Sequence, residues 1–323
     1  MSETEIRHAV GVDFGGTFIK MAVVSERGEI KARTRINTAE AATPELWLKA
    51  VARGVDQLVA EARLTGSRDL RGVGVGVPGF VDYGRGFVFV LPNVPGWTKV
   101  PLAPRLEDLL GLHVRVDNDV NAMAIGECTF GAGRAYQHAV FVTLGTGVGG
   151  GLLIDNKLYR GAFSMAGEIG HISIEKEGVQ SPQGKGGLEQ YIGNRRIVEY
   201  ALSLVDGGRP SAMLDLVGGD RTRLNPEVIN KAAAAGDRLA LDVFDYVADC
   251  LATAFASITY LIQPQAFIVG GGVALSGPVL FEPLRRHLAA RLHPFFAERI
   301  EVKQAELGND AGVIGSATLV LVD

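Results

Sequence analysis

Apolar and polar positions along the chain form blocks, and one order of blocks occurs twice. Residues 8–12 (HAVGV) lead into DFGGT, after which come FIKMAVV, the polar turn SERGE and IKARTRI. Residues 138–144 (HAVFVTL) lead into GTGVGG, after which come GLLI, the polar turn DNK and LY. Short apolar runs bounded by glycine and polar turns are typical of strands. We interpret the repeat as an internal duplication of a strand, glycine turn, strand, turn, strand architecture, with little residue identity.

Other segments have the spacing of helices. In residues 44–64 one apolar face is expected to hold Leu46, Val51, Val55, Leu58, Val59 and Ala62. Further helices are expected near 101–110, 188–205, 226–261, 278–292 and 310–321, and further strands at 71–77, 112–116, 265–272 and 299–305. Strands that alternate with helices predict an α/β fold with partly parallel sheets. The two similar halves predict two domains that face each other across a cleft.

Composition and charge narrow the class of protein. A chain of 323 residues with 47% hydrophobic and 21% charged residues is typical of a globular protein, and its length predicts about two domains. The net charge of −4 argues against nucleic acid as a partner, because nucleic-acid binding needs a basic face. The two cysteines, Cys128 and Cys250, form no CxxC motif, and no apolar leader or membrane-length apolar run is visible. We therefore expect a cytoplasmic protein without a membrane partner.

Three glycine-rich turns follow predicted strands, at Gly15-Gly16-Thr17, Gly145-Thr146-Gly147 and Gly270-Gly271-Gly272. Such turns can aim several backbone N–H groups at a phosphate, although glycine is also common in ordinary hairpin turns. Two stretches, Gly74–Gly79 and Gly145–Gly150, match the dinucleotide pattern GxGxxG. Neither is followed by a helix start, as that pattern requires, so a nicotinamide dehydrogenase is a poor interpretation. No GxxxxGK[ST] phosphate loop is present either.

Residues 115–127 (RVDNDVNAMAIGE) place four short polar side chains where a strand meets a helix: Asp117, Asn118, Asp119 and Asn121. A helix N-cap would explain one of them, but Ala122 stands where a capping box around Asp119 would have Glu or Gln. Aspartate and asparagine can also bind the hydroxyls of a sugar, and an aspartate can accept a hydroxyl proton. For Asp117 a structural role is the alternative to sugar binding.

Six motifs in order resemble the ROK family (repressor, open reading frame, kinase) of actin-like sugar kinases. VDFGGTFIKMAVV resembles the first phosphate motif and VTLGTGVGGGLL the second, and VPGFVD, PNVPGW, DNDVNAMAIGE and GEIGH complete the set. The resemblance runs from about residue 8 to the C-terminus. It implies two actin-like (ribonuclease H-like) α/β domains around a cleft. The expected division is a smaller domain of residues 1–117 plus 308–323, with the first phosphate turn and part of the sugar pocket, and a larger domain of residues 118–307, with the catalytic aspartate, the second turn and the adenosine site.

The resemblance also implies roles for individual residues. Asp119 matches the general base, and Asn118 matches its neighbour that holds sugar hydroxyls. The residues matching the far side of the sugar ring are Glu168, His171 and Glu189, and those in motifs lining the sugar pocket are Gly79 and Asn93. The phosphate turns are matched by Gly15, Gly16, Thr17, Gly145, Thr146 and Gly147, and the adenosine site by Gly271 and Gly272. Asp13 resembles the carboxylate that helps to hold Mg²⁺ through water. Lys20 has no such match and is expected at the surface or in an interdomain ion pair.

The chain departs from the family at its zinc site. Most members carry CxCGxxGC after the GH motif, but the corresponding segment here is SPQGKGGLE, without cysteine. Four zinc ligands cannot be assembled there by spacing, so we expect no structural zinc. Only a dozen residues precede Asp13 in this sequence, so we expect no helix-turn-helix of the kind that the family's repressors carry.

The glucokinase branch is the most similar in PNVPGW and VPGFVD. The expected reaction is transfer of phosphate from MgATP to O6 of glucose, in a protein that the resemblance implies to be a homodimer. Kinases of fructose, mannose, allose, N-acetylglucosamine or N-acetylmannosamine share these motifs, and a few hydroxyl contacts decide among them. A polyphosphate donor and a non-catalytic sugar sensor on the same fold are the remaining alternatives.

Overall fold

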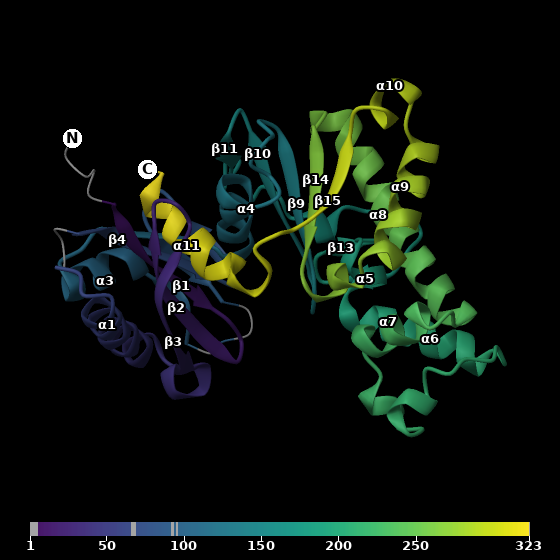
Figure 1. Cartoon of the computed structure of the whole chain (residues 1–323), viewed down its shortest axis with the longest axis horizontal. Helices are drawn as coiled ribbons and strands as arrows, with labels where there is room; N and C mark the ends of the chain where they lie inside the picture. Colours follow the sequence, from purple (N-terminus) through teal and green to yellow (C-terminus); the bar gives the residue numbers. More distant parts are fainter. Residues whose placement is uncertain (1–5, 66–68, 92–93, 95, 323) are drawn as a thin grey trace. The chain divides into compact units, whose positions relative to one another are not determined.

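The computed structural model describes residues 6–65, 69–91, 94 and 96–322. The chain divides into two compact α/β units (Figure 1). Unit 1 comprises residues 1–135, 157–166 and 306–323, and unit 2 comprises residues 136–156 and 167–305. The division expected after residue 117 therefore falls after residue 135 instead. The reason is that strand β8 (Val114–Asn118) pairs with β4 (Leu70–Val77) in unit 1, and helix α4 (Asp119–Phe130) follows it there.

Unit 1 is built on a five-stranded sheet in the order β3-β2-β1-β4-β8. Its first three strands are β1 (His8–Phe14), β2 (Phe18–Ser25) and β3 (Ile30–Asn37). β2 is antiparallel to both β1 and β3, whereas β4 runs parallel to β1, and β8 runs parallel to β4. The sheet is thus partly parallel, as the sequence predicts.

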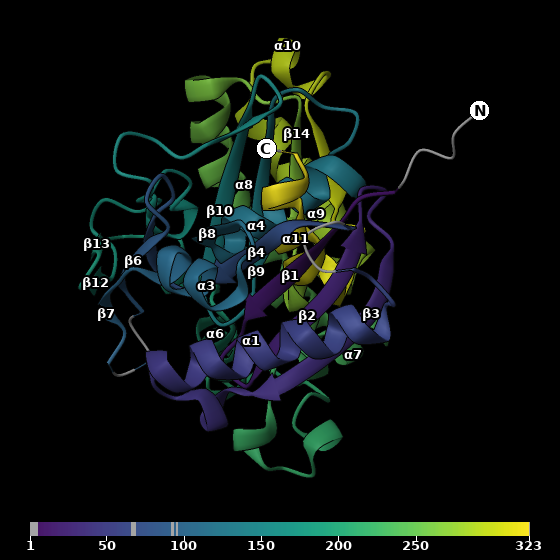
Figure 2. The ribbon, with the colours of Figure 1, turned by 90° about the vertical axis from the view of Figure 1, so that its left-hand side faces the viewer.

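Helices cover both faces of this sheet. On one face lie α1 (Pro44–Glu61), which Figure 2 shows running across the strands, and α3 (Leu102–Leu110). Between them and the sheet the rings of Phe14, Trp47 and Trp97 pack with centroids 5.2–5.6 Å apart. Both tryptophans are fully buried, as expected of packing residues. Leu46 does not join this face of α1, because its side chain is 49% exposed.

The other face of the sheet carries the C-terminal helix α11 (Ala311–Leu321), which packs on Ala9, Ala22 and Val24. A Cβ at Gly11 would lie 1.8 Å from the Val313 carbonyl oxygen. The absence of a side chain there lets the α11 backbone touch the sheet. Unit 1 also contains β11 (Lys157–Tyr159) and a second, three-stranded antiparallel sheet that the sequence pattern did not predict, formed by β5 (Phe80–Asp82), β6 (Phe87–Val90) and β7 (Thr98–Val100).

Unit 2 repeats the strand arrangement. Within it the strands run in the order β10-β9-β14-β15, with bounds Val148–Ile154, Ala139–Leu144, Ala266–Gly270 and Glu301–Gln304. β9 and β10 are antiparallel, whereas β14 is parallel to both β9 and β15. The same antiparallel start and parallel continuation occur in unit 1, which agrees with an internal duplication.

Helices of unit 2 pack around the buried helix α8 (Arg238–Ile262). The other helices of this unit are α5 (Glu189–Ile192), α6 (Asn194–Asp206), α7 (Pro226–Ala234), α9 (Pro278–Arg291) and α10 (Pro294–Ala297). Two helices expected as continuous are each broken. The segment 188–205 breaks at Gly193, which is extended, and the segment 226–261 breaks before Asp237, whose side chain caps α8 by accepting from the Ala240 N–H.

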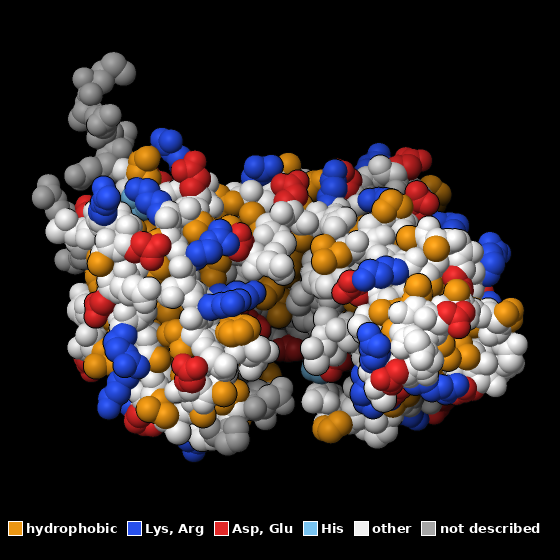
Figure 3. Space-filling view, turned by 60° about the horizontal axis from the view of Figure 1, so that its bottom comes forward, with side chains coloured by type: hydrophobic (Ala, Val, Ile, Leu, Met, Phe, Trp, Pro, Cys, Tyr) orange, Lys and Arg blue, Asp and Glu red, His pale blue; other side chains and the backbone are white. Residues whose placement is uncertain are grey.

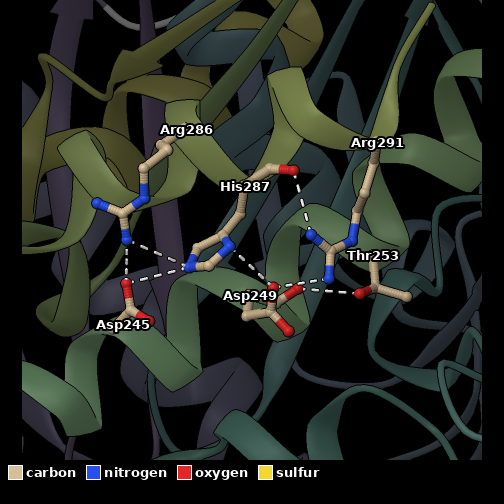
Figure 4. A network of polar contacts seen from close by, with 6 residues as sticks. All are labelled: Asp245, Asp249, Thr253, Arg286, His287 and Arg291. Carbon is tan, nitrogen blue, oxygen red and sulfur yellow. Dashed lines mark hydrogen bonds and ion pairs between the residues drawn. The ribbon is translucent and has the colours of Figure 1, made fainter.

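A network of polar side chains joins α8 to α9 (Figure 4). The His287 ring lies 3.0 Å from a carboxylate oxygen of Asp245 and 3.0 Å from one of Asp249. Arg286 also pairs with Asp245, and Arg291 lies 2.6 Å from Asp249. Each carboxylate of α8 therefore contacts one arginine of α9 and the His287 ring, and these contacts link the two helices.

Over the face drawn in Figure 3, Lys and Arg side chains lie interspersed with Asp and Glu side chains. Among the described helices, none combines the length and the apolar character needed to cross a membrane.

Candidate active site

The polar cluster predicted at the start of a helix lies where β8 passes into α4 in unit 1. Asn118 is the N-cap: its Oδ1 accepts from the N–H groups of Val120 at 2.9 Å and Asn121 at 3.2 Å. Its Nδ2 donates to the Gly79 carbonyl at 3.3 Å. Asp119 is the first residue of the helix and is half-buried. The positive end of the helix dipole favours a carboxylate at this position.

Asp117 stabilises this turn through an ion pair and hydrogen bonds. Its carboxylate is buried and lies 2.8 Å from both Nε and Nη2 of Arg160. Its other oxygen accepts from the Asn118 N–H at 2.8 Å and from Asn121 Nδ2 at 3.0 Å. Burial raises the pKa of the Asp117 carboxyl, against the opposing effect of Arg160. Of the four polar residues, Asn118 is therefore the helix cap, and the buried Asp117 and Asn121 are bonded to each other. This confirms a structural role for Asp117.

Arg160 was not found by sequence reasoning. It follows β11, and its guanidinium also lies over the Tyr83 ring, 3.5 Å from the centroid. The link to Asp117 spans 43 positions, so no local pattern could reveal it.

The first glycine turn joins β1 to β2. The Gly15 N–H donates to the Phe18 carbonyl at 3.1 Å, and the Thr38 hydroxyl donates to the Gly15 carbonyl at 2.8 Å. Gly16 and Thr17 at its tip are exposed. The turn is thus held from both sides of its base, with its tip open to a ligand.

Asp13 precedes this turn, with its carboxylate against the first turn of α11. A Cβ at Gly312 would lie 2.5 Å from that carboxylate, so only glycine leaves room for it. Burial raises the pKa of Asp13, and Lys20, whose Nζ lies 3.9 Å away, opposes the rise. Lys20 is therefore paired within unit 1. Mg²⁺ sites for phosphates commonly use one or two carboxylates together with water, so a single carboxylate here fits the expected ion.

Two predicted residues, Gly79 and Asn93, belong to motifs expected to line a sugar pocket. A Cβ at Gly79 would lie 2.3 Å from the Val90 carbonyl oxygen, so glycine is needed for close packing, and its own carbonyl holds Asn118. Asn93 lies outside the described residues.

In unit 2 the structure brings Glu168, His171 and Glu189 close to the second glycine turn. Glu189 Oε2 accepts from the Val148 N–H at 2.9 Å, and a Cβ at Gly147 would lie 2.3 Å from that oxygen. The His171 ring lies 3.7 Å from the Glu168 carboxylate. Burial raises the pKa of Glu168; His171 lowers it, and Glu189 raises it further. A cluster with two acceptors and one imidazole suits a ligand rich in hydroxyl groups.

The second turn lies at the N-terminus of α6. The Asn194 N–H donates to the Gly145 carbonyl at 2.9 Å, and α6 has no side-chain cap. Thr146 lies at the exposed tip of the turn. The unsatisfied N–H groups and the dipole at a helix N-terminus favour an anion, which agrees with a phosphate turn.

A cavity of about 300 Å³ adjoins this helix end, lined in part by Asn194, Asn230, Gly272 and Ser276. The side-chain oxygens of Asn194 and Asn230 are buried, with no hydrogen-bond partner among the residues that the structure describes. Gly271 precedes the cavity with φ of +85°, which favours glycine. Sequence reasoning found the glycines here but missed both asparagines. Asn194 stands at a helix start, where asparagine usually indicates a cap, and Asn230 lies inside α7.

The segment that replaces the family's zinc site is held by backbone and side-chain hydrogen bonds. It contains a short hairpin of β12 (Gln180–Ser181) and β13 (Gly184–Lys185). The Tyr191 hydroxyl accepts from the Val179 N–H at 3.1 Å, and Lys185 lies 2.8 Å from Glu177. Among the described residues no group of three or more His, Cys, Asp or Glu could hold a metal ion.

Comparisons with known proteins show the family of the chain. A glucokinase of Halalkalibacterium halodurans is 38% identical over 97% of this chain and 95% of its own length. A glucokinase of Streptomyces coelicolor is 36% identical over 96% of each chain. The solved structure of a ROK family glucokinase from Streptomyces griseus, in complex with glucose and AMPPNP, matches with a TM-score of 0.79 at 36% identity, covering 97% of this chain and 98% of that one. The ROK family match covers residues 9–322, and the chain therefore belongs to the ROK family.

Proposed function

We propose that this protein is an ATP-dependent glucose kinase that transfers the γ-phosphoryl group of MgATP to O6 of glucose. The observation that carries the proposal is the position of Asp119. This residue is half-buried and is the first residue of α4. It directly follows the buried Asp117 and the helix cap Asn118. The similarity to glucokinases over nearly the whole chain supports the choice of sugar.

In the proposed reaction Asp119 accepts the proton of the sugar hydroxyl as its oxygen attacks the γ-phosphorus, and ADP leaves. A sugar alcohol is a weak nucleophile, so a positioned base contributes to the rate. The N–H groups of the turns at Gly15–Thr17 and Gly145–Gly147 bind phosphate oxygens, with α6 adding its dipole. Asp13 would hold Mg²⁺ through water, and the bound ion would supply charge neutralisation for the phosphates.

The sugar is proposed to be held by Asn118, Glu168, His171 and Glu189, with the loops of Gly79 and Asn93 lining its pocket. Oδ1 of Asn118 is occupied by two backbone N–H groups, and one Nδ2 hydrogen donates to the Gly79 carbonyl, so the second Nδ2 hydrogen is the donor proposed for the sugar. The carboxylates accept from sugar hydroxyls, and His171 can donate or accept according to its tautomer.

The adenosine of ATP is proposed to occupy the cavity beside Gly271 and Gly272. The buried amide oxygens of Asn194 and Asn230 need donors, and an exocyclic amine is one. We expect Asn230→Leu to raise the KM for ATP while leaving the KM for glucose unchanged. Equal KM values for ATP in this variant and the parent would place the adenosine elsewhere.

The main test measures ADP release with MgATP across glucose, fructose, mannose, allose, N-acetylglucosamine and N-acetylmannosamine. We expect a preference for glucose, and a loss of about 10²–10⁴-fold in kcat for Asp119→Asn with glucose binding preserved. Asp108→Asn, an exposed aspartate on α3, is the matched control. A near-normal kcat for Asp119→Asn would refute the assigned base, and silence of the parent across the panel would refute the kinase.

We make three further proposals. The family resemblance supports a homodimer, the cysteine usage and the lack of a visible apolar leader support a cytoplasmic location, and the segment SPQGKGGLE, without cysteine, supports the absence of structural zinc. Sedimentation of the purified protein tests the first.

A further inference from the structure

Another cavity, of about 380 Å³, lies in unit 2 and is lined by residues of α9, α10 and β15 (Figure 1). The residues that line it have no part in the reaction proposed above. Ligand sites of proteins are commonly concave and of about 300–1,000 Å³, with an apolar lining and a few placed polar groups. The volume of this cavity falls within that range, so its lining shows what kind of ligand would fit.

The inner wall of the cavity is apolar. Leu288 and Leu292 of α9 and Val302 of β15 line it, and these residues are only 3–7% exposed because they also belong to the core of unit 2. Two small residues, Ala289 and Ala297, lie beside them in the lining. Alanine leaves more room at these positions than a larger apolar side chain would. The inner wall therefore suits an apolar group.

The rim of the cavity carries one positive charge in excess. Its charged side chains are Arg285, Glu301 and Lys303. Lys303 Nζ lies 2.8 Å from the Glu301 carboxylate, so these two charges offset each other. Arg285 forms no ion pair with any residue that the structure describes; its Nη2 donates to the Val302 carbonyl at 2.8 Å. The rim is thus complementary to a ligand with a single negative charge.

The backbone of β15 places a second donor beside Arg285. β15 is the last strand in the sheet order, and the Glu301 N–H donates to the Gln265 carbonyl on the side of β14. Because successive residues of a strand alternate in this direction, the N–H and the carbonyl of Val302 face the open edge of the sheet. The Val302 carbonyl holds the guanidinium of Arg285 at this edge. The Val302 N–H and the remaining guanidinium N–H groups can therefore reach one carboxylate.

We propose that this cavity binds a small amphipathic carboxylic acid. Its carboxylate accepts from Arg285 and from the Val302 N–H, and its alkyl chain lies over Leu288 and Leu292. A guanidinium binds a carboxylate through two parallel hydrogen bonds, whereas the apolar wall disfavours an inorganic anion, which has no apolar part. The proposal does not rest on the kinase function, because its test measures binding alone.

The test is calorimetric titration of the full chain with sodium octanoate, below the concentration at which octanoate forms micelles. We expect octanoate to bind at least tenfold more tightly than butyrate, because each methylene group removed from water contributes up to about fourfold in affinity. 1-Octanol has the alkyl chain without the charge and should bind about tenfold more weakly than octanoate. Equal affinity for octanoate and butyrate, or no binding of octanoate, overturns the proposal.

Two variants separate the polar end of the site from its apolar part. Arg285→Gln should weaken octanoate binding about tenfold and leave 1-octanol binding unchanged, whereas Ala289→Leu fills the apolar part and should weaken both. Both side chains are exposed, so neither substitution is expected to unfold unit 2. The control Arg238→Gln removes the same charge from the exposed first residue of α8, outside the cavity, and should bind as the parent does.

The position of the ligand is tested by nuclear magnetic resonance of the ¹⁵N-labelled chain. Octanoate should shift the amide signal of Val302 in the parent and should shift it less in the Arg285→Gln variant. Equal octanoate affinity in the parent and in Arg285→Gln, or an unchanged Val302 signal in the saturated parent, overturns the proposal.

Discussion

The buried pair of Asp117 and Arg160 allows a quantitative test of how the catalytic turn is supported. Arg160→Leu leaves the Asp117 carboxylate, which is 1% exposed, without its counter-ion and with only the Asn118 N–H and the Asn121 amide as donors. Removing one partner of a buried pair costs about 3–5 kcal/mol. We expect this loss in the free energy of unfolding, together with a lower kcat, since Asn118 and Asp119 rest on the pair.

Tryptophan fluorescence isolates the effect. The only two tryptophans of the chain, Trp47 and Trp97, are fully buried in unit 1, so their emission during urea unfolding reports this unit. With a slope of about 3 kcal/mol per M, the midpoint should fall by about 1–1.7 M. The double variant Asp117→Asn/Arg160→Leu removes both charges and should be more stable than Arg160→Leu alone.

The pH dependence gives a second reading. Burial raises the pKa of folded Asp117 above its unfolded value, and loss of Arg160 raises it further. A raised pKa means that the folded state keeps the proton to higher pH than the unfolded state, so stability falls as pH rises through that window. Arg160→Leu should therefore lose more stability at pH 8 than at pH 5. A midpoint within 0.3 M of the parent (about 1 kcal/mol), or a double variant no more stable than the single one, would refute the reasoning.

Three further predictions concern glycines and the missing zinc. Gly147→Ala should displace the Glu189 carboxylate and raise the KM for sugar more than the KM for ATP; an unchanged KM for sugar would remove Glu189 from the site. Gly312→Ala should push the Asp13 carboxylate from α11 and raise the Mg²⁺ concentration needed for half-maximal activity, with the Trp fluorescence midpoint as a check on folding. Elemental analysis should find no zinc, and Tyr191→Phe should loosen the segment by about 1 kcal/mol, seen as faster proteolysis; one zinc per chain would contradict this.

Much of the fold could be predicted because each unit begins with buried strands separated by glycine turns. Periodicity identified the segments of β1–β4 and of α1, α3 and α11 closely. It missed the sheet β5-β6-β7, whose strands hold only three or four residues each and alternate too briefly to show a period. It also ran across the break at Asp237, because apolar spacing continues on both sides of the cap.

The candidate site was predictable to the extent that its residues follow one another in the sequence. Asn118 and Asp119 were visible as a polar run, but which residue caps the helix depends on backbone geometry. Arg160 pairs with a residue distant in sequence, and Asn194 and Asn230 come from different helices to line one cavity, so their positions became visible only in the structure.

The packing of α11 on β1 has a consequence for how the chain is made on the ribosome. Residues 167–305 of unit 2 are complete before the segment from residue 306 onward, which unit 1 requires, has been synthesised. Until then the surface of Ala9, Ala22 and Val24 has no cover. Domains usually fold as units in the order of synthesis, but here the first unit to begin is the last to close. The apolar surface of the nascent N-terminal half therefore stays exposed until the segment from residue 306 onward has been made.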